Sequence, residues 1–138
     1  RGNIGTRPNL AVPGKRMLSS MSPTILARDG TLFMVTGSPG GRTIINTVLM
    51  TILNVVDFGM NAQEAVDAGR IHHQWLPDRI NYERYGFSAD TIARLKAMGH
   101  TVNEQGGQGV AEVIVVGSDG VLEGGLDRRA PDGGAAGK

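Results

Sequence analysis

The hydrophobic positions change their spacing along the chain. Two short apolar runs, Thr24–Arg28 and residues 32–36, flank Asp29-Gly30, a dipeptide typical of a tight hairpin turn. From Arg42 to about Gly59 the apolar residues recur at helical spacing instead. This stripe comprises Ile44, Ile45, Val48, Leu49, Ile52, Leu53 and Val56. Its width predicts a helix that is covered on most sides.

Two shorter helices are predicted by their end signals. Asn61 and Glu64 have capping-box spacing, and Gly69 is a suitable residue to follow the end of that helix. Ser88 is the predicted cap of another helix, which Gly99 ends. The apolar positions of that helix are Ile92, Leu95 and Met98.

The rest of the chain is predicted to be strand or loop. Residues 1–17 are an irregular arm because prolines and glycines interrupt them, and residues 71–85, interrupted by Pro77, are extended and loop-like. Residues 110–116 form a strand that Asp119-Gly120 turns back into residues 121–123. The expected fold is a single α+β domain over residues 1–138, with about five short, mostly antiparallel strands and three helices.

Composition excludes several functions. The chain has 138 residues, 40% hydrophobic and 20% charged, with 14 Lys+Arg against 13 Asp+Glu, a formal charge of +1. This balance argues against nucleic acid and membrane surfaces as partners. No apolar run reaches the roughly 18 residues needed for a membrane span. The absence of cysteine excludes disulfides and thiolate chemistry.

A glycine-rich turn precedes the long helix. In TGSPGG (residues 36–41), Gly40 and Gly41 place backbone N–H groups at the positive end of the helix dipole. Such a turn can bind a phosphate, stabilise an oxyanion, or simply connect a strand to a helix. Neither the P-loop pattern nor the dinucleotide glycine pattern is present, which argues against phosphate.

A second polar block is LSSMSPT (residues 18–24). The adjacent hydroxyls of Ser19 and Ser20 can bind a carboxylate, or they can satisfy the backbone of a loop. A serine nucleophile is not expected because no Gly-x-Ser-x-Gly elbow is present.

Two further groups are interpreted as structural. His72 and His73 are adjacent in an extended segment, so they point to opposite faces and cannot easily share a metal. We expect no metal site. The charged tail residues Asp127, Arg128, Arg129 and Asp132 form either a solvated face or an ion-paired closure.

Taken in order, these segments resemble one family, the γ-glutamyltransferases (glutathione hydrolases). PGKRMLSSMSPT (residues 13–24) resembles the family's Leu-Ser-Ser-Met-Ser-Pro block, and GSPGG (residues 37–41) follows at the family's spacing. HHQWLPD (residues 72–78) matches another family segment, and Asp127-Arg128-Arg129 resembles its Asp-Pro-Arg motif with Arg128 in place of proline. The resemblance covers nearly the whole chain.

The resemblance implies the four-layer αββα fold of N-terminal-nucleophile hydrolases, matured by self-cleavage into a large and a small subunit. It also implies cofactor-free transfer of a γ-glutamyl group through a threonyl ester, in a periplasmic or secreted enzyme. Ser19 and Ser20 would hold the α-carboxylate of the donor, and the N–H groups of Gly40 and Gly41 would stabilise the oxyanion. The expected partners are a γ-glutamyl substrate, the large subunit and the first part of the small subunit.

One departure shapes the functional expectation. The family's nucleophilic threonine lies in a Thr-Thr-His-like motif upstream of the serine block, and this sequence contains no such motif. We therefore expect a C-terminal portion of a small subunit, inactive and prone to self-association when alone. The alternatives are a noncatalytic binding or assembly module on the same scaffold, and a related acylase acting on cephalosporins or poly-γ-glutamate.

Overall fold

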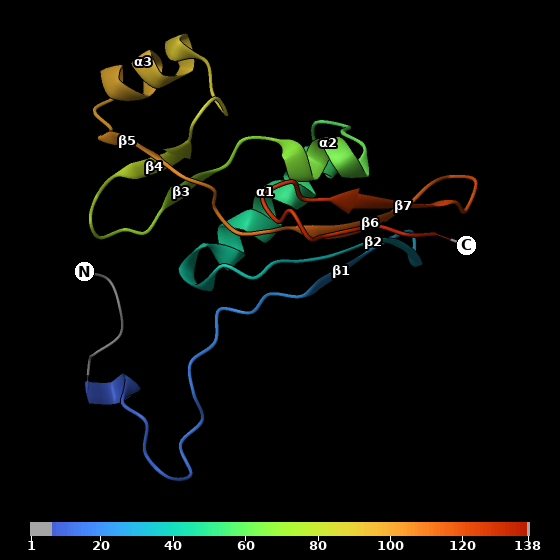
Figure 1. Cartoon of the computed structure of the whole chain (residues 1–138), viewed down its shortest axis with the longest axis horizontal. Helices are drawn as coiled ribbons and strands as arrows, with labels where there is room; N and C mark the ends of the chain where they lie inside the picture. Colours follow the sequence, from blue (N-terminus) through green and yellow to red (C-terminus); the bar gives the residue numbers. More distant parts are fainter. Residues whose placement is uncertain (1–6, 138) are drawn as a thin grey trace.

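A four-stranded sheet with two helices on one face forms the main body of the protein (Figure 1). The computed structural model describes residues 7–137. Its strands are β1 (Thr24–Arg28), β2 (Thr31–Gly37), β3 (Ile71–His73), β4 (Ile80–Glu83), β5 (Val102–Gln105), β6 (Glu112–Val116) and β7 (Leu122–Leu126). Its helices are α1 (Ile44–Val56), α2 (Ala62–Asp67) and α3 (Ala89–Ala97), with short 3-10 turns η1 (Arg7–Asn9) and η2 (Gly41–Thr43).

The large sheet has the order β1-β2-β6-β7 and is antiparallel throughout. Asp29 and Gly30 connect β1 to β2, and both have left-handed backbone angles, φ 51° and 79°. Two positive φ values match the tight turn that best fits the twist of a hairpin. The hairpin predicted from the sequence is confirmed.

The core lies between this sheet and α1 and α2. Met34, Val113 and Val115 on the sheet are buried in one cluster with Val55 of α1 and Val66 of α2. The opposite face of the sheet is open: Ile25, Val35 and Ile114 lie in register across three strands and are 74%, 38% and 45% exposed.

The prediction that α1 is covered on most sides is wrong for the described residues. Ile45, Leu49 and Val56 are about half exposed, whereas Ile44, Val48 and Val55 are buried. The apolar stripe is therefore wider than the surface that this part of the chain can cover.

A smaller sheet, β3-β4-β5, accounts for the strands that the sequence pattern missed. Residues 71–85 contain β3 and β4, which are antiparallel to one another and are joined by a loop that contains Pro77. β5 is parallel to β4. These strands are three or four residues long and largely polar, so the described residues contain seven strands where about five were predicted. The three predicted helices are confirmed.

The helix ends follow the predicted side-chain chemistry. Asn61 and Glu64 form a complete capping box on α2, and the Ser88 side chain accepts a hydrogen bond from the Thr91 amide at the start of α3. Gly69 follows α2 as predicted, but its backbone is not left-handed. Its small size matters for another reason, because a Cβ there would lie 2.3 Å from the Cα of Gly86.

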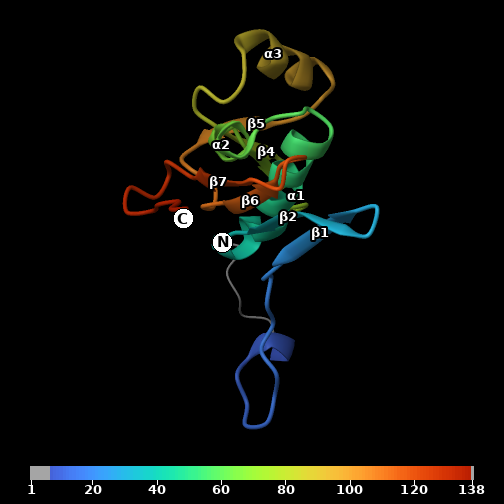
Figure 2. The ribbon, with the colours of Figure 1, turned by 90° about the vertical axis from the view of Figure 1, so that its right-hand side faces the viewer.

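Residues 7–17 form an arm that extends away from the sheets and helices (Figure 2), and residues 1–6 of the predicted arm lie outside the described residues. Apart from η1 the arm has no regular structure, in agreement with its proline and glycine content. No helix in the described range 7–137 has the length and apolar character of a membrane span.

Candidate functional site

The structure brings the serine block and the glycine turn together. Thr24 pairs with Thr36 at the ends of β1 and β2, so the residues just before β1 and just after β2 are neighbours. The Ser20 hydroxyl donates a hydrogen bond to the carbonyl oxygen of Gly41 at 2.6 Å. Two segments selected separately from the sequence thus form one local site.

The two serines differ in how their hydroxyl groups are used. The Ser19 oxygen accepts a hydrogen bond from the Met21 amide at 3.1 Å, and none of residues 7–137 accepts its proton. The Ser20 proton is already donated to Gly41. Ser22 supports the turn by donating to the Ser20 carbonyl at 3.1 Å. Ser19 is exposed and has a hydroxyl proton to offer a ligand.

The backbone at Gly40 and Gly41 leaves two amides unpaired within residues 7–137, at the start of a helix. Gly40 has φ 142° and Gly41 has φ 58°, and both glycines are exposed at the start of the η2–α1 helix. The hydroxyl and amide of Thr43 both donate to the Gly40 carbonyl, at 3.0 and 3.2 Å. No hydrogen bond among the described residues uses the amide of Gly40 or Gly41. Two unpaired donors at a helix N-terminus favour negative charge.

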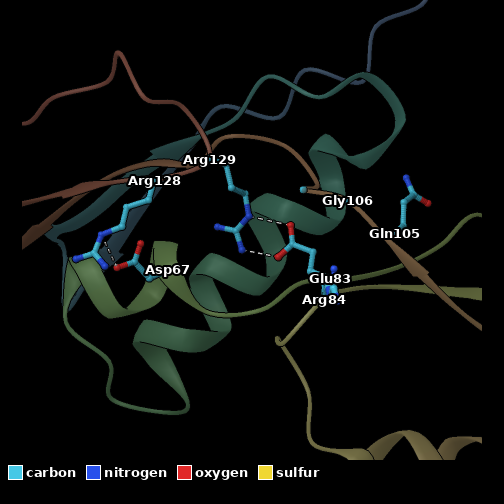
Figure 3. A pocket seen from close by; sticks show the side chains of 8 residues that line it. Asp67, Glu83, Arg84, Gln105, Gly106, Arg128 and Arg129 are labelled. Atoms are coloured by element: carbon cyan, nitrogen blue, oxygen red, sulfur yellow. Dashed lines mark hydrogen bonds and ion pairs between the residues drawn. The ribbon is translucent and has the colours of Figure 1, made fainter.

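Next to this turn lies a buried network of charged residues that the sequence did not reveal. Arg70 binds Asp127 at 2.6 Å, and Arg129 binds Asp127 at 3.0 Å. Arg129 also binds both carboxylate oxygens of Glu83 (Figure 3). Asp127, Arg70 and Glu83 are 1%, 2% and 6% exposed. The interpretation of the tail as a solvated face is wrong for Asp127, and its ion-paired alternative is correct.

The network holds backbone as well as side chains. Asp127 accepts hydrogen bonds from the amides of Ala111 and Arg129 at 2.6 and 3.0 Å. Glu83 accepts from the amides of Arg70 and Gln108 at 3.0 and 2.6 Å. Every carboxylate in the network is therefore satisfied by several donors, as buried charges require.

Opposing effects set the pKa values of the network. Burial alone would raise the pKa of Asp127, but the hydrogen bonds from Ala111, Arg129 and Arg70 outweigh it and lower that pKa. Burial lowers the pKa of Arg70, although Asp127 opposes the shift. For Arg129, burial would lower the pKa, but its bonds to Glu83 and Asp127 raise it. The carboxylate of Asp127 is held in its charged form.

Two open hollows meet at Arg129. One, of about 400 Å³, is lined by Asp67, Glu83, Arg84, Gln105, Gly106, Gly107, Arg128 and Arg129 (Figure 3). The other, of about 500 Å³, lies beside the glycine turn and is lined by Pro39, Gly40, Gly107, Gly109, Val110 and Arg129. Gly40 therefore lines an open hollow that Arg129 also lines.

The two adjacent histidines have separate partners. His72 is buried and its Nε2 lies 2.6 Å from Gln74 Oε1, while His73 Nε2 lies 3.0 Å from Asp78 Oδ1. No cluster of three or more metal-ligating side chains occurs within residues 7–137.

The fold defines the class of protein: the chain has the fold of the N-terminal-nucleophile hydrolases. A solved structure of a variant of the gamma-glutamyltranspeptidase from Helicobacter pylori matches it with a TM-score of 0.85 and 42% identity, covering 94% of this chain and 71% of that chain. The family model for gamma-glutamyltranspeptidase matches residues 3–137. The chain belongs to the gamma-glutamyltranspeptidase family, as the resemblance predicted.

Two further comparisons show the extent of the match. The glutathione hydrolase proenzyme of Escherichia coli (strain K12) is 49% identical over 131 residues, which are 95% of this chain and 22% of that protein. The cephalosporin acylase from Bacillus halodurans has a TM-score of 0.76 and 26% identity, covering 86% of this chain and 23% of that chain. The chain thus spans only about a fifth of the length of the Escherichia coli relative.

Proposed function

We propose that this chain is the C-terminal portion of a γ-glutamyltransferase small subunit. The intact enzyme transfers the γ-glutamyl group of glutathione-like donors to water, amino acids or dipeptides through a threonyl ester. The observation that supports this most strongly is the bond between Ser20 and Gly41, because it places the serine hydroxyl groups next to the glycine turn, whose amides are unpaired in the described part of the chain. An acyl-transfer site for a γ-glutamyl donor needs both a carboxylate site and an oxyanion site.

In this proposal Ser19 and Ser20 hold the α-carboxylate of the donor. The amides of Gly40 and Gly41 stabilise the negative oxygen of the tetrahedral intermediate. Each donor aimed at such an oxygen contributes about 10²–10³ to the rate. The nucleophilic threonine is supplied by a segment that this sequence does not contain, together with the large subunit and the first part of the small subunit.

The isolated chain tests the missing nucleophile. We expect it to show no turnover of γ-glutamyl anilides or glutathione, because loss of the nucleophile in a hydrolase costs about 10⁶ in kcat. Turnover that survives rigorous purification would contradict the proposal. The coding frame upstream of Arg1 provides a second test. A Thr-Thr-His-like motif there supports the enzyme, whereas a start codon next to Arg1 supports the noncatalytic module.

A related acylase is the second candidate, and the match to cephalosporin acylase supports it. The 49% identity to a glutathione hydrolase proenzyme, against 26% to the acylase, favours γ-glutamyl donors. Assaying the full-length protein with glutathione, a glutaryl cephalosporin and poly-γ-glutamate separates the candidates. Fractionation of cells that express the full-length protein tests the periplasmic or secreted location.

A further inference from the structure

Gly109 approaches the glycine turn more closely than a residue with a side chain could. A Cβ built on Gly40 would lie 3.1 Å from the Cα of Gly109. A Cβ built on Gly109, whose φ is 71°, would lie 2.7 Å from Thr47 Oγ1 and 2.9 Å from Ser38 Oγ. The backbone of Gly109 therefore packs directly against the turn that carries Gly40.

Ser38 ties the two segments together from the other side. Its hydroxyl accepts a hydrogen bond from the Val110 amide at 3.2 Å and donates one to the Pro39 carbonyl at 2.6 Å. This one hydroxyl thus links two positions that are 72 residues apart in the sequence. It also holds the peptide immediately before Gly40. The other residues of the Gly37–Gly41 segment are three glycines and a proline, so no other side chain of this segment can make this link.

The segment that carries Gly109 is itself held rigidly. The carbonyl of Gln108 accepts from Arg70 at 2.8 Å, its amide donates to Glu83 at 2.6 Å, and the Gly109 carbonyl accepts from Arg70 at 3.3 Å. The charged network therefore anchors one side of the segment, while Gly109 and Ser38 present the other side to the glycine turn.

We propose that Ser38 and Gly109 are positioning residues that fix the direction of the Gly40 and Gly41 amides. This inference rests on the proposed function of those amides as the oxyanion site. An oxyanion site works because its donors are already oriented before the charge develops, so a displaced turn lowers the rate of the chemical step. Ground-state binding of the donor through Ser19, whose hydroxyl makes no bond to the glycine turn, does not depend on that orientation.

The first experiment needs no catalysis. In the ¹⁵N-labelled chain, Ser38→Ala should shift the amide resonances of Gly40 and Gly41 and raise the exchange rate of the Val110 amide roughly fivefold, the value of one net hydrogen bond. Ser38→Thr keeps the hydroxyl and should restore both. Gly106→Ala is the matched control, because no atom lies within 4 Å of a Cβ at Gly106 and its φ is not positive. Unchanged Gly40 and Gly41 resonances in Ser38→Ala would overturn the inference.

The second experiment uses the full-length protein. Ser38→Ala and Gly109→Ala should lower kcat about tenfold or more, a fraction of the loss of one oxyanion donor. The dissociation constant of L-glutamate should stay unchanged, and its binding stoichiometry gives the folded, competent fraction. Ser38→Thr should restore kcat.

Equal kcat in Ser38→Ala and Gly106→Ala would reject the positioning role. If the unmodified protein does not turn over γ-glutamyl donors, the proposed function fails instead, and the amide resonances still decide whether the two residues fix the turn.

Discussion

Ser20 donates its hydroxyl proton to the carbonyl oxygen of Gly41, 21 residues further along the chain. A carboxylate accepts hydrogen bonds and offers no proton in return. Ser20 must therefore release Gly41 before it can donate to a bound carboxylate. Ser19 faces no such competition, because its oxygen accepts from Met21 while its proton has no acceptor among residues 7–137.

This asymmetry makes the two serines unequal in the proposed donor site. In the full-length protein Ser19→Ala should lower kcat/KM for γ-glutamyl donors about 10- to 150-fold, because a hydrogen bond to a charged group contributes about 1.5–3 kcal/mol. Ser20→Ala should lower kcat/KM less. In the unmodified protein Ser20 gives up its bond to Gly41 when it binds the carboxylate, so its net contribution to binding is smaller.

Donors without the α-carboxylate provide the control for this prediction, because neither substitution should affect them. Steady-state kinetics with matched donors measures the difference. If the double variant keeps full activity and donor preference, the carboxylate assignment is wrong and the hydroxyls serve only the loop.

The buried pair Arg70–Asp127 should dominate the stability of the second half of the chain. Asp127→Ala leaves two arginines without their shared carboxylate, which costs about 3–5 kcal/mol in comparable buried pairs. Urea unfolding measures the change. Arg128→Ala is the matched control, because it removes an exposed arginine from a 3.5 Å pair with the partly buried Asp67, and surface pairs contribute about 0–1 kcal/mol. Equal losses of unfolding free energy in Asp127→Ala and Arg128→Ala would contradict the assignment of Asp127 as the centre of the network.

The lowered pKa of Asp127 predicts a dependence of stability on pH. Its native pKa lies below the unfolded value, so its stabilising contribution is complete above about pH 4 and is lost as the pH falls through the native pKa. Between pH 6 and pH 2 the free energy of unfolding should therefore fall more steeply in the unmodified chain than in Asp127→Asn. Parallel curves for the unmodified chain and Asp127→Asn would reject the prediction.

Local patterns predicted the elements that local chemistry determines. The Asp29-Gly30 turn, the Asn61–Glu64 capping box and the Ser88 cap each depend on residues a few positions apart, and the structure contains all three. β3, β4 and β5 were missed because they are short and polar, and pairing between them, rather than an apolar alternation, defines them.

The charged network could not be derived from the sequence for a similar reason. Arg70 and Asp127 are 57 residues apart, and nothing near either residue marks it as buried. At Asp127 the available signals were the charged tail, for which an ion-paired closure was one alternative, and the Asp-Pro-Arg resemblance; neither identifies Arg70 or Glu83 as a partner. The contact between the serine block and the glycine turn follows from the predicted hairpin, because the two segments border that hairpin and each carries its own motif.

Gly69 and Gly86 should tolerate no side chain. A Cβ on Gly69 would lie 2.3 Å from the Gly86 Cα and 2.6 Å from its carbonyl oxygen, so the backbone after α2 would have to move away from the turn after β4. Overpacking of this kind costs about 1–3 kcal/mol. We expect Gly69→Ala to lower the urea midpoint accordingly, while Gly106→Ala, which meets no atom within 4 Å, leaves it nearly unchanged. The same midpoint in both variants would show that the two segments do not touch in solution.

The open face of the large sheet should make the isolated chain self-associate. Ile25, Val35 and Ile114 form an exposed apolar row across three paired strands, and rows of this kind pack against other surfaces. Val35 occupies the middle of the row, so Val35→Lys would place a charge in the buried centre of any contact between two copies. Sedimentation velocity should therefore show association of the unmodified chain and a monomer for Val35→Lys.

Val121→Lys makes the same change at an exposed valine in the turn between β6 and β7, away from the row, and should associate as the unmodified chain does. Loss of association in Val121→Lys as well would mean that net charge, rather than the apolar row, controls it. A compact monomer of the unmodified chain at high concentration, with no binding of apolar dyes, would show that the exposed row does not drive contact between copies.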